Sequence, residues 1–278
     1  MEYLPKSSEA EPLAKNTFNE FHLKKIKLNS KRIIGIMGAM PEEVDGIVEL
    51  LEHRETFVEG MRTYHCGLIN NTKVVIVFSR WGKVAASATA STLILKFGVT
   101  EIIFTGVAGA IDKRLEIGDL VIGEQFYQHD MDARPLIEEF EIPLLNKSFF
   151  ESDNKLRNKA IESINELIFN GRFRNILLQS SYTSRINAPK LYLGDIASGD
   201  HFFSSNIAKE KLQAKLPNIL CVEMEGAAVA QVCFEFDIPF LVIRTISDKA
   251  DETSPIEFMS FIKEIASQYS KALIKCIV

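Results

Sequence analysis

Carboxylates follow several short hydrophobic runs in this chain of 278 residues. Glu43 comes shortly after the run Arg32–Gly38, Glu225 follows a second run, and Asp248 follows a third. Carboxyl groups in a nonpolar cleft can exchange protons with a substrate, because burial moves their pKa toward neutral pH. Taken alone, each is more typical of a helix start or a cap. Only their joint placement after strands indicates a site.

The elements that must position these groups alternate between two patterns. Near-continuous apolar runs, typical of strands, cover residues 32–38, 61–69, 73–79, 101–106, 119–124, 191–198, 219–224 and 240–247. Helical spacing covers residues 41–51, 82–97, 153–169, 226–236 and 256–274. Strands that alternate with helices predict a mainly parallel or mixed sheet with helices on both faces. Asn70-Asn71 favours a tight hairpin between the second and third runs.

The chain divides into an N-terminal extension, residues 1–30, and a single domain, residues 31–278. The first segment is polar, mixed in charge and without the apolar core of a secretory signal. No break in composition divides the rest. The stretch 130–184 is the least regular, and it holds Pro135 and Pro143.

Composition excludes several classes of function. The net charge of −5 argues against nucleic-acid binding, which needs a basic face. No apolar run approaches the roughly 18 residues of a membrane span. Four scattered cysteines show no metal-binding spacing and indicate free thiols in a reducing cytoplasm. His129 and His201 are more typical of structural groups than of metal ligands.

Phosphate-binding loops are also excluded. Gly82-Lys83 is followed by Val84, where a nucleotide-binding loop needs Ser or Thr for magnesium. No Gly-x-Gly-x-x-Gly sequence follows a predicted strand. The chain therefore lacks the signatures of nucleotide-phosphate and dinucleotide sites.

Five segments at predicted strand ends carry the polar and glycine-rich residues: 38–43, 105–109, 198–203, 222–226 and 244–248. Ligands of open α/β sheets usually bind beyond the carboxyl ends of strands. The five segments together predict a cleft with several carboxylates and nonpolar walls.

These segments carry a resemblance to a known family. GAMPEEV, GKVAA, TGVAGA, SGDHFF, VEMEGAAVA and RTISDKADE, in this order, resemble the 5′-methylthioadenosine/S-adenosylhomocysteine nucleosidases of the nucleoside phosphorylase superfamily. The resemblance extends from Ile33 to the C-terminus. It implies a three-layer α/β/α fold around a central mixed β-sheet, usually a homodimer, with no metal or cofactor. The implied reaction hydrolyses the N-glycosidic bond of 5′-thio-substituted adenine nucleosides and releases adenine.

The resemblance also implies catalytic roles. Asp248 matches the general acid that protonates N7 of the departing adenine, and Ser247 orients it. Glu43 matches the base that activates a water, and Arg244 helps to hold that water. Two carboxyl groups that flank a glycosidic bond are the general arrangement of inverting hydrolysis.

The implied substrate contacts surround these groups. Glu225 binds the ribose hydroxyls, Phe202 stacks on the base, and Trp81 borders the 5′ substituent. The complete predicted set is Met40, Trp81, Val107, Ala108, Gly109, Phe202, Phe203, Glu223, Met224, Glu225 and Phe258.

Two departures from the family pattern leave alternatives open. Val107 stands where many relatives have serine, and Trp81 stands where a smaller aliphatic residue is common. The nearest alternative is a nucleosidase of the same family that prefers 6-amino-6-deoxyfutalosine. A phosphorylase is less favoured, because the acids of GAMPEE would repel phosphate. A non-catalytic binding protein would have no need of Glu43 and Asp248.

Overall fold

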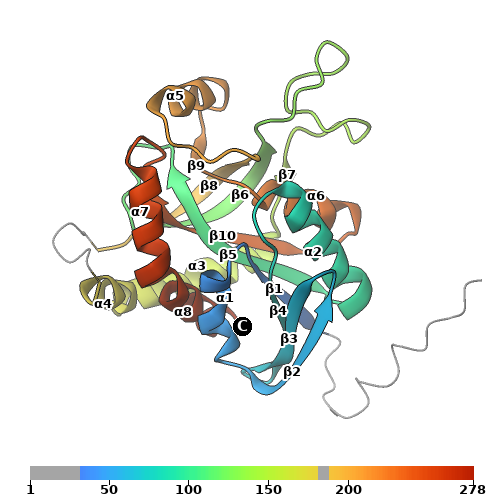
Figure 1. Cartoon of the computed structure of the whole chain (residues 1–278), viewed down its shortest axis with the longest axis vertical. Coiled ribbons are helices and arrows are strands. Elements are labelled where there is room, and N and C mark those ends of the chain that lie inside the picture. The colour runs from blue at the N-terminus through green and yellow to red at the C-terminus, as the bar shows by residue number, and fades with distance from the viewer. Residues whose placement is uncertain (1–31, 181–187) are drawn as a thin grey trace, which may run out of the picture. The chain divides into compact units, whose positions relative to one another are not determined.

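The computed structural model describes residues 32–180 and 188–278. The predicted extension, residues 1–30, lies outside the described residues. A ten-stranded mixed sheet runs through the described part, with helices on both of its faces (Figure 1). The strands are β1 (Ile33–Gly38), β2 (Glu52–Glu59), β3 (Arg62–Ile69), β4 (Thr72–Phe78), β5 (Glu101–Ala110), β6 (Leu120–Gln128), β7 (Phe150–Glu151), β8 (Leu191–Ser198), β9 (Ile219–Glu223) and β10 (Phe240–Asp248). The helices are α1 (Pro41–Val48), α2 (Lys83–Phe97), α3 (Asn154–Phe169), α4 (Arg172–Leu178), α5 (Asn206–Lys215), α6 (Gly226–Glu235), α7 (Ser254–Phe261) and α8 (Ser267–Ile277), and the π-helical turn Ile262–Ala266 joins the last two.

The strand pairings close part of the sheet into a ring. The order is β10-β6-β8-β9-β5-β1-β4-β3-β2, and β10 also pairs with β5. Strands β5, β10, β6, β8 and β9 therefore form a closed circuit, from which β1, β4, β3 and β2 extend. The mixed sheet flanked by helices confirms the predicted three-layer α/β/α architecture.

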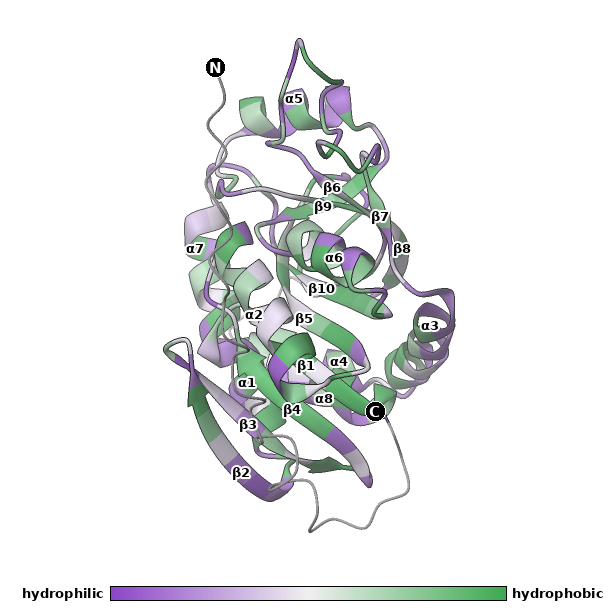
Figure 2. Cartoon of the chain, turned by 90° about the vertical axis from the view of Figure 1, so that its right-hand side faces the viewer, coloured by the Kyte–Doolittle hydropathy of each residue, from purple (hydrophilic) through white to green (hydrophobic). Residues whose placement is uncertain are grey.

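The alternating side chains of β1 explain why its sequence is apolar throughout. Ile34 and Ile36 pack on the side of α1 and α8, whereas Met37 packs on the side of α2 and α6. When helices cover both faces of a sheet, a strand buries the side chains on both of its sides, so both sets are apolar. Figure 2 shows the result, with hydrophobic strands in the middle and hydrophilic residues on the outer helix faces. Helix α2 turns Ala86 and Ala90, both fully buried, toward the sheet.

The hairpin predicted at Asn70-Asn71 is confirmed. Both asparagines have positive φ, 48° and 62°, and they join β3 to β4 with a two-residue turn. Such turns match the right-handed twist of the paired strands, and asparagine tolerates their backbone angles. β3 also pairs with β2, a strand that the sequence pattern does not predict. Most β2 side chains are exposed and polar, so the strand has no apolar alternation.

The remaining differences from the predicted elements are local. α1 ends at Val48 rather than Leu51, and the short elements β7, α4 and α5 were not predicted. β7 has two residues and α5 buries only Leu212, so neither shows a hydrophobic period. α3 begins where expected, because Asp153 caps it by accepting bonds from the amides of Lys155 and Leu156.

Candidate active site

The predicted site residues lie together in one cleft. The cleft opens to solvent, and every predicted substrate contact lines it, together with Glu43, Ser247 and Asp248. Ala39, His201 and Val222 line it as well, although the sequence analysis did not assign them there. Arg244 is not among the lining residues and lies behind the wall.

The closed circuit of strands brings these residues together. Gly109 of β5 pairs with Asp248 of β10 on one side and with Val222 of β9 on the other. Glu223, the next residue of β9, pairs with Ser198 of β8. Ligands of open α/β sheets usually bind beyond the carboxyl ends of parallel strands. Because β9 runs antiparallel to β5, this rule does not account for the whole site. The second half of β5 pairs with both β10 and β9, and so brings their site residues together.

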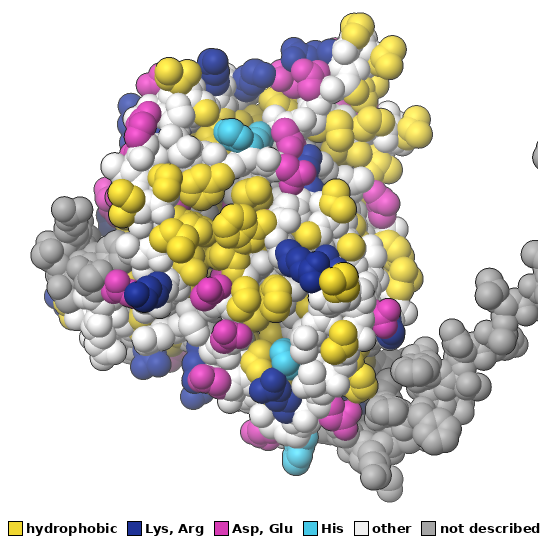
Figure 3. Space-filling model, viewed as in Figure 1, with side chains coloured by type: hydrophobic (Ala, Val, Ile, Leu, Met, Phe, Trp, Pro, Cys, Tyr) yellow, Lys and Arg dark blue, Asp and Glu magenta, His cyan; other side chains and the backbone are white. Residues whose placement is uncertain are grey.

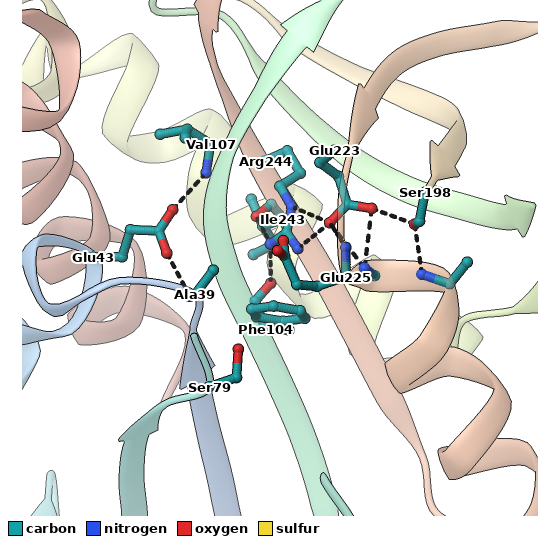
Figure 4. A network of polar contacts seen from close by, with 12 residues as sticks. Ala39, Glu43, Ser79, Phe104, Val107, Ser198, Glu223, Glu225, Ile243 and Arg244 are labelled. Atoms are coloured by element: carbon teal, nitrogen blue, oxygen red, sulfur yellow. Dashed lines mark hydrogen bonds and ion pairs between the residues drawn. The ribbon is translucent and has the colours of Figure 1, made fainter. Parts of the chain in front are cut away.

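Glu43 is held by backbone amides at the start of α1. One carboxylate oxygen accepts bonds from the amides of Ala39 at 2.5 Å and Met40 at 3.0 Å. The other accepts from the amide of Val107 at 3.1 Å, so the residue that replaces a family serine still contributes its backbone (Figure 4). Gly106 makes this approach possible, because a Cβ there would lie 2.8 Å from Glu43 Oε1. Burial raises the pKa of Glu43 above 4.5, against the opposing effects of Arg244 and the amides.

A bulge at the end of β10 directs two neighbouring side chains into the cleft. Successive side chains of a regular strand point to opposite faces. The pairing of β10 with β5 shifts register between Ile246 and Asp248, and both Ser247 and Asp248 line the cleft. Ser247 Oγ donates to Asp248 Oδ2 at 2.7 Å. Ser247 and Asp248 are therefore in direct contact, as the expected role of Ser247 in orienting the carboxyl group requires.

Asp248 is placed to hold a proton. Its side chain is buried, and Oδ1 accepts a bond from the amide of Ala250 at 2.9 Å. Burial raises the pKa of the carboxyl above its ordinary 3.8, while hydrogen bonds from Ser254, Ser247 and Ala250 act in the opposite direction. A carboxyl group with a raised pKa is suited to general acid catalysis.

Arg244 and Glu223 form a buried ion pair beneath the cleft. Arg244 Nη2 lies 2.6 Å from Glu223 Oε2, and the guanidinium lies over the ring of Phe104 at 4.1 Å from its centroid. Glu223 also accepts hydrogen bonds from Ser198 Oγ and the amide of Gly226 (Figure 4). A carboxylate buried on an apolar strand needs such partners, because its desolvation is otherwise uncompensated. The guanidinium N–H groups of Arg244 donate to Glu223 and to two backbone carbonyls. In this structure Arg244 therefore serves mainly to stabilise the charge of Glu223.

Glu225 lies beside this pair at the N-terminus of α6. Its Oε1 accepts a bond from the amide of Gly82 at 2.8 Å. Burial and then the charge of Glu223 raise the pKa of Glu225 to about 8, whereas Arg244 and the Gly82 amide lower it. Glu43, Glu223 and Glu225 all face the single charge of Arg244, which cannot neutralise all three.

Glu225 should therefore make stability depend on pH. An unfolded chain loses this proton near pH 4.5 and the folded chain near pH 8, so the free energy of unfolding falls as pH rises between about these values. Glu225→Gln keeps the group neutral and removes this loss. We expect its melting temperature, relative to wild type, to rise steadily from pH 5 to pH 8. Glu210→Gln, on an exposed face of α5, controls for loss of a charge. A difference that does not change with pH would contradict this assignment.

Aromatic side chains form the nonpolar wall. The rings of Trp81 and Phe202 each meet Phe258 edge to face, with centroids 6.0 Å and 5.5 Å apart. His201, which the sequence analysis interpreted as a structural group, lines the cleft and contacts the ring of Phe203. Trp81 is 53% exposed at the opening. Figure 3 shows hydrophobic side chains gathered over the middle of this face, between α7 and α2.

No group of His, Cys, Asp or Glu within residues 32–180 and 188–278 is arranged to hold a metal ion. In the same ranges, no helix combines the length and apolarity that crossing a membrane requires.

Comparison with known proteins identifies the family. The model of the phosphorylase superfamily matches residues 33–278. The chain belongs to the phosphorylase superfamily. Among superfamily relatives, the aminodeoxyfutalosine nucleosidase of Helicobacter pylori is 36% identical over 245 residues, which are 86% of this chain and 95% of that protein. The 5′-methylthioadenosine/S-adenosylhomocysteine nucleosidase of Staphylococcus aureus is 33% identical over 242 residues, 87% of this chain and 97% of that one.

A solved superfamily structure agrees with these matches. The Streptococcus pneumoniae MTA/SAH nucleosidase in complex with 8-aminoadenine has a TM-score of 0.75 and 33% identity, over 87% of this chain and 99% of that chain. The chain thus spans nearly the full length of its relatives. The predicted membership and fold are confirmed.

Proposed function

We propose that this protein hydrolyses the N-glycosidic bond of 5′-substituted adenine nucleosides, foremost 5′-methylthioadenosine and S-adenosylhomocysteine, and releases adenine. One observation carries the proposal: a single cleft holds two buried carboxyl groups on different elements, Glu43 at the start of α1 and Asp248 at the end of β10. Relatives named as nucleosidases of such substrates support it.

Asp248 supplies the proton for the departing base. Adenine leaves poorly as an anion, so protonation at N7 lowers the barrier as the bond to the sugar breaks. The raised pKa of Asp248 favours the protonated form, and Ser247 holds the carboxyl in the cleft. The proton passes from Asp248 to N7, and the bonding electrons remain on the base.

Glu43 activates the water. As the sugar becomes electron-poor, water adds to its C1′ carbon and gives a proton to Glu43. The amides of Ala39, Met40 and Val107 fix the carboxylate and hold it ready before the reaction. Glu225 accepts hydrogen bonds from the ribose hydroxyls, and the rings of Phe202 and Phe258 enclose the base and the 5′ group.

The charge of the cleft favours water over phosphate as the attacking group. Its described lining contains Glu43, Glu223, Glu225 and Asp248, and neither Lys nor Arg. A phosphate dianion would find no unpaired cation among these lining residues, because Arg244 is already paired with Glu223, and the ionised Glu43 would repel it. This distribution supports hydrolysis rather than phosphorolysis.

A preference for 6-amino-6-deoxyfutalosine is the second candidate, and Trp81 favours it. The exposed indole stands at the opening beside Phe258 and offers a broad aromatic surface to a larger 5′ substituent. The Helicobacter pylori relative supports this candidate as well.

Initial rates of adenine release test both candidates. We expect release from 5′-methylthioadenosine, S-adenosylhomocysteine or 6-amino-6-deoxyfutalosine in phosphate-free buffer, and the highest kcat/KM identifies the preferred 5′ group. Adenosine, which lacks the larger 5′ substituent, is the matched control and should react more slowly. Absence of release from all of them would overturn the proposed function.

We propose further that the enzyme is a cytoplasmic homodimer that acts in methionine salvage. Cys66, Cys221, Cys233 and Cys276 are all free thiols, as is typical of a reducing compartment. Val84, Leu95 and Phe234 expose hydrophobic side chains on α2 and α6, which supports a subunit contact there.

A further inference from the structure

The N-terminus of α2 holds two carboxylates with consecutive amides. Gly82 N donates to Glu225 Oε1 at 2.8 Å, and Lys83 N donates to Asp200 Oδ1 at 2.8 Å. Glu225 lines the cleft, whereas Asp200 does not. The Gly82–Lys83 backbone therefore connects Glu225, which we assign to the ribose site, with Asp200, which lies outside the cleft.

The contact between Asp200 and this segment is close. Gly82 has a φ of +91°, and a Cβ there would lie 2.9 Å from Asp200 Oδ1. Only glycine fits both the backbone angle and the space. A displacement of Asp200 would free the Gly82–Lys83 backbone to move, and the amide on Glu225 would move with it.

Asp200 is itself held in place from the other side. Its amide donates to Asp130 Oδ2 at 3.0 Å, and Lys83 Nζ donates to Asp130 Oδ1 at 2.6 Å and to Gln128 Oε1 at 3.2 Å. Lys83 thus binds Asp200 through its backbone and Asp130 through its side chain. The hydrogen bonds form a closed circuit among the start of α2, the end of β6 and the loop after β8.

We propose that Asp200 is a positioning residue that aligns Glu225 for the ribose hydroxyls through the Gly82–Lys83 backbone. The proposal rests on the proposed function and explains the aspartate of the SGDHFF motif, which does not line the cleft. Asp200 acts on capture of the nucleoside sugar and has no part in the proton transfers of Glu43 and Asp248.

Asp200→Ala and Asp200→Asn test this. Removing the acceptor should weaken binding of 5′-methylthioadenosine, seen as KM, about tenfold, with a much smaller change in kcat. The dissociation constant of free adenine should stay near wild type, because adenine has no ribose to meet Glu225. Asp200→Asn keeps an oxygen for the Lys83 amide and should restore most of the affinity. Asp132→Ala is the matched control, since its carboxylate pairs with Arg134.

The outcomes are distinct. Equal weakening of adenine and nucleoside binding in Asp200→Ala would overturn the inference, because a general disturbance of the cleft would act on both. An unchanged KM in Asp200→Ala would overturn it too, as would a loss of affinity in Asp200→Asn equal to that in Asp200→Ala. If the alanine variant does not fold, Asp200→Leu, which keeps a side chain of similar size but offers no acceptor to the Lys83 amide, carries the test with the same expected rise in KM. Absence of turnover in wild type would instead contradict the proposed function itself.

Discussion

Asp248→Asn should reduce kcat for adenine release about 10²- to 10⁴-fold, the range usual for loss of a general acid. Asparagine has the same shape and can still accept the bond from Ala250, but it cannot deliver a proton to N7. Adenine affinity should change little. The rate should be measured by adenine release at saturating 5′-methylthioadenosine, with binding measured separately.

Asp251→Asn is the matched control for this variant. Asp251 lies three residues further along, and its carboxylate accepts bonds from Thr253 instead of facing the cleft. It should keep near wild-type activity. Wild-type turnover in Asp248→Asn would show that the proton comes from another group. In the wild type, kcat should fall as pH rises through the raised pKa of Asp248, because the acid is then ionised.

Glu43→Gln should cause a loss of similar size, because the variant cannot take a proton from the attacking water. Glutamine keeps the volume, but its single amide oxygen can replace only one of the two carboxylate oxygens. With that oxygen toward the Ala39 and Met40 amides, the start of α1 keeps its contacts and only the bond from the Val107 amide is lost. The measurement is again kcat with 5′-methylthioadenosine. Glu42→Gln changes the exposed neighbour on the same helix turn and should leave kcat unchanged.

A nucleoside analogue with a leaving group that needs no protonation separates the two roles. Such a substrate should restore turnover to Asp248→Asn, since departure of the base no longer requires an acid. It should not restore Glu43→Gln, where the water step is impaired. Equal rescue of both variants would contradict the division of labour between the two carboxyl groups.

Much of the fold was predictable because its central strands are buried on both faces. β1 and the first half of β10, Phe240 to Ile243, carry uninterrupted apolar residues, and the asparagine pair specifies the β3–β4 turn. β2 was missed because an exposed edge strand needs no apolar alternation. The closure of β5, β10, β6, β8 and β9 into a circuit was also not predictable, since it depends on pairing between strands far apart in sequence.

The strand-end segments predicted a shared cleft, and the resemblance of their motifs to the nucleosidase family supplied the residues that line it, but their contacts were not predictable. The bulge that turns both Ser247 and Asp248 into the cleft has no signal in the sequence. The partner of Glu223 proved to be Arg244, a residue expected to serve the water. His201 sits between predicted contacts in SGDHFF, and that neighbourhood was the available signal for its place in the cleft.

The most direct test of the central claim is the effect of phosphate on the reaction and on its sugar product. The enzyme should release adenine from its preferred nucleoside at the same rate with and without phosphate, and the sugar should be free of phosphate in both cases. Formation of a sugar 1-phosphate, with a rate that rises with phosphate concentration, would contradict hydrolysis by a Glu43-activated water.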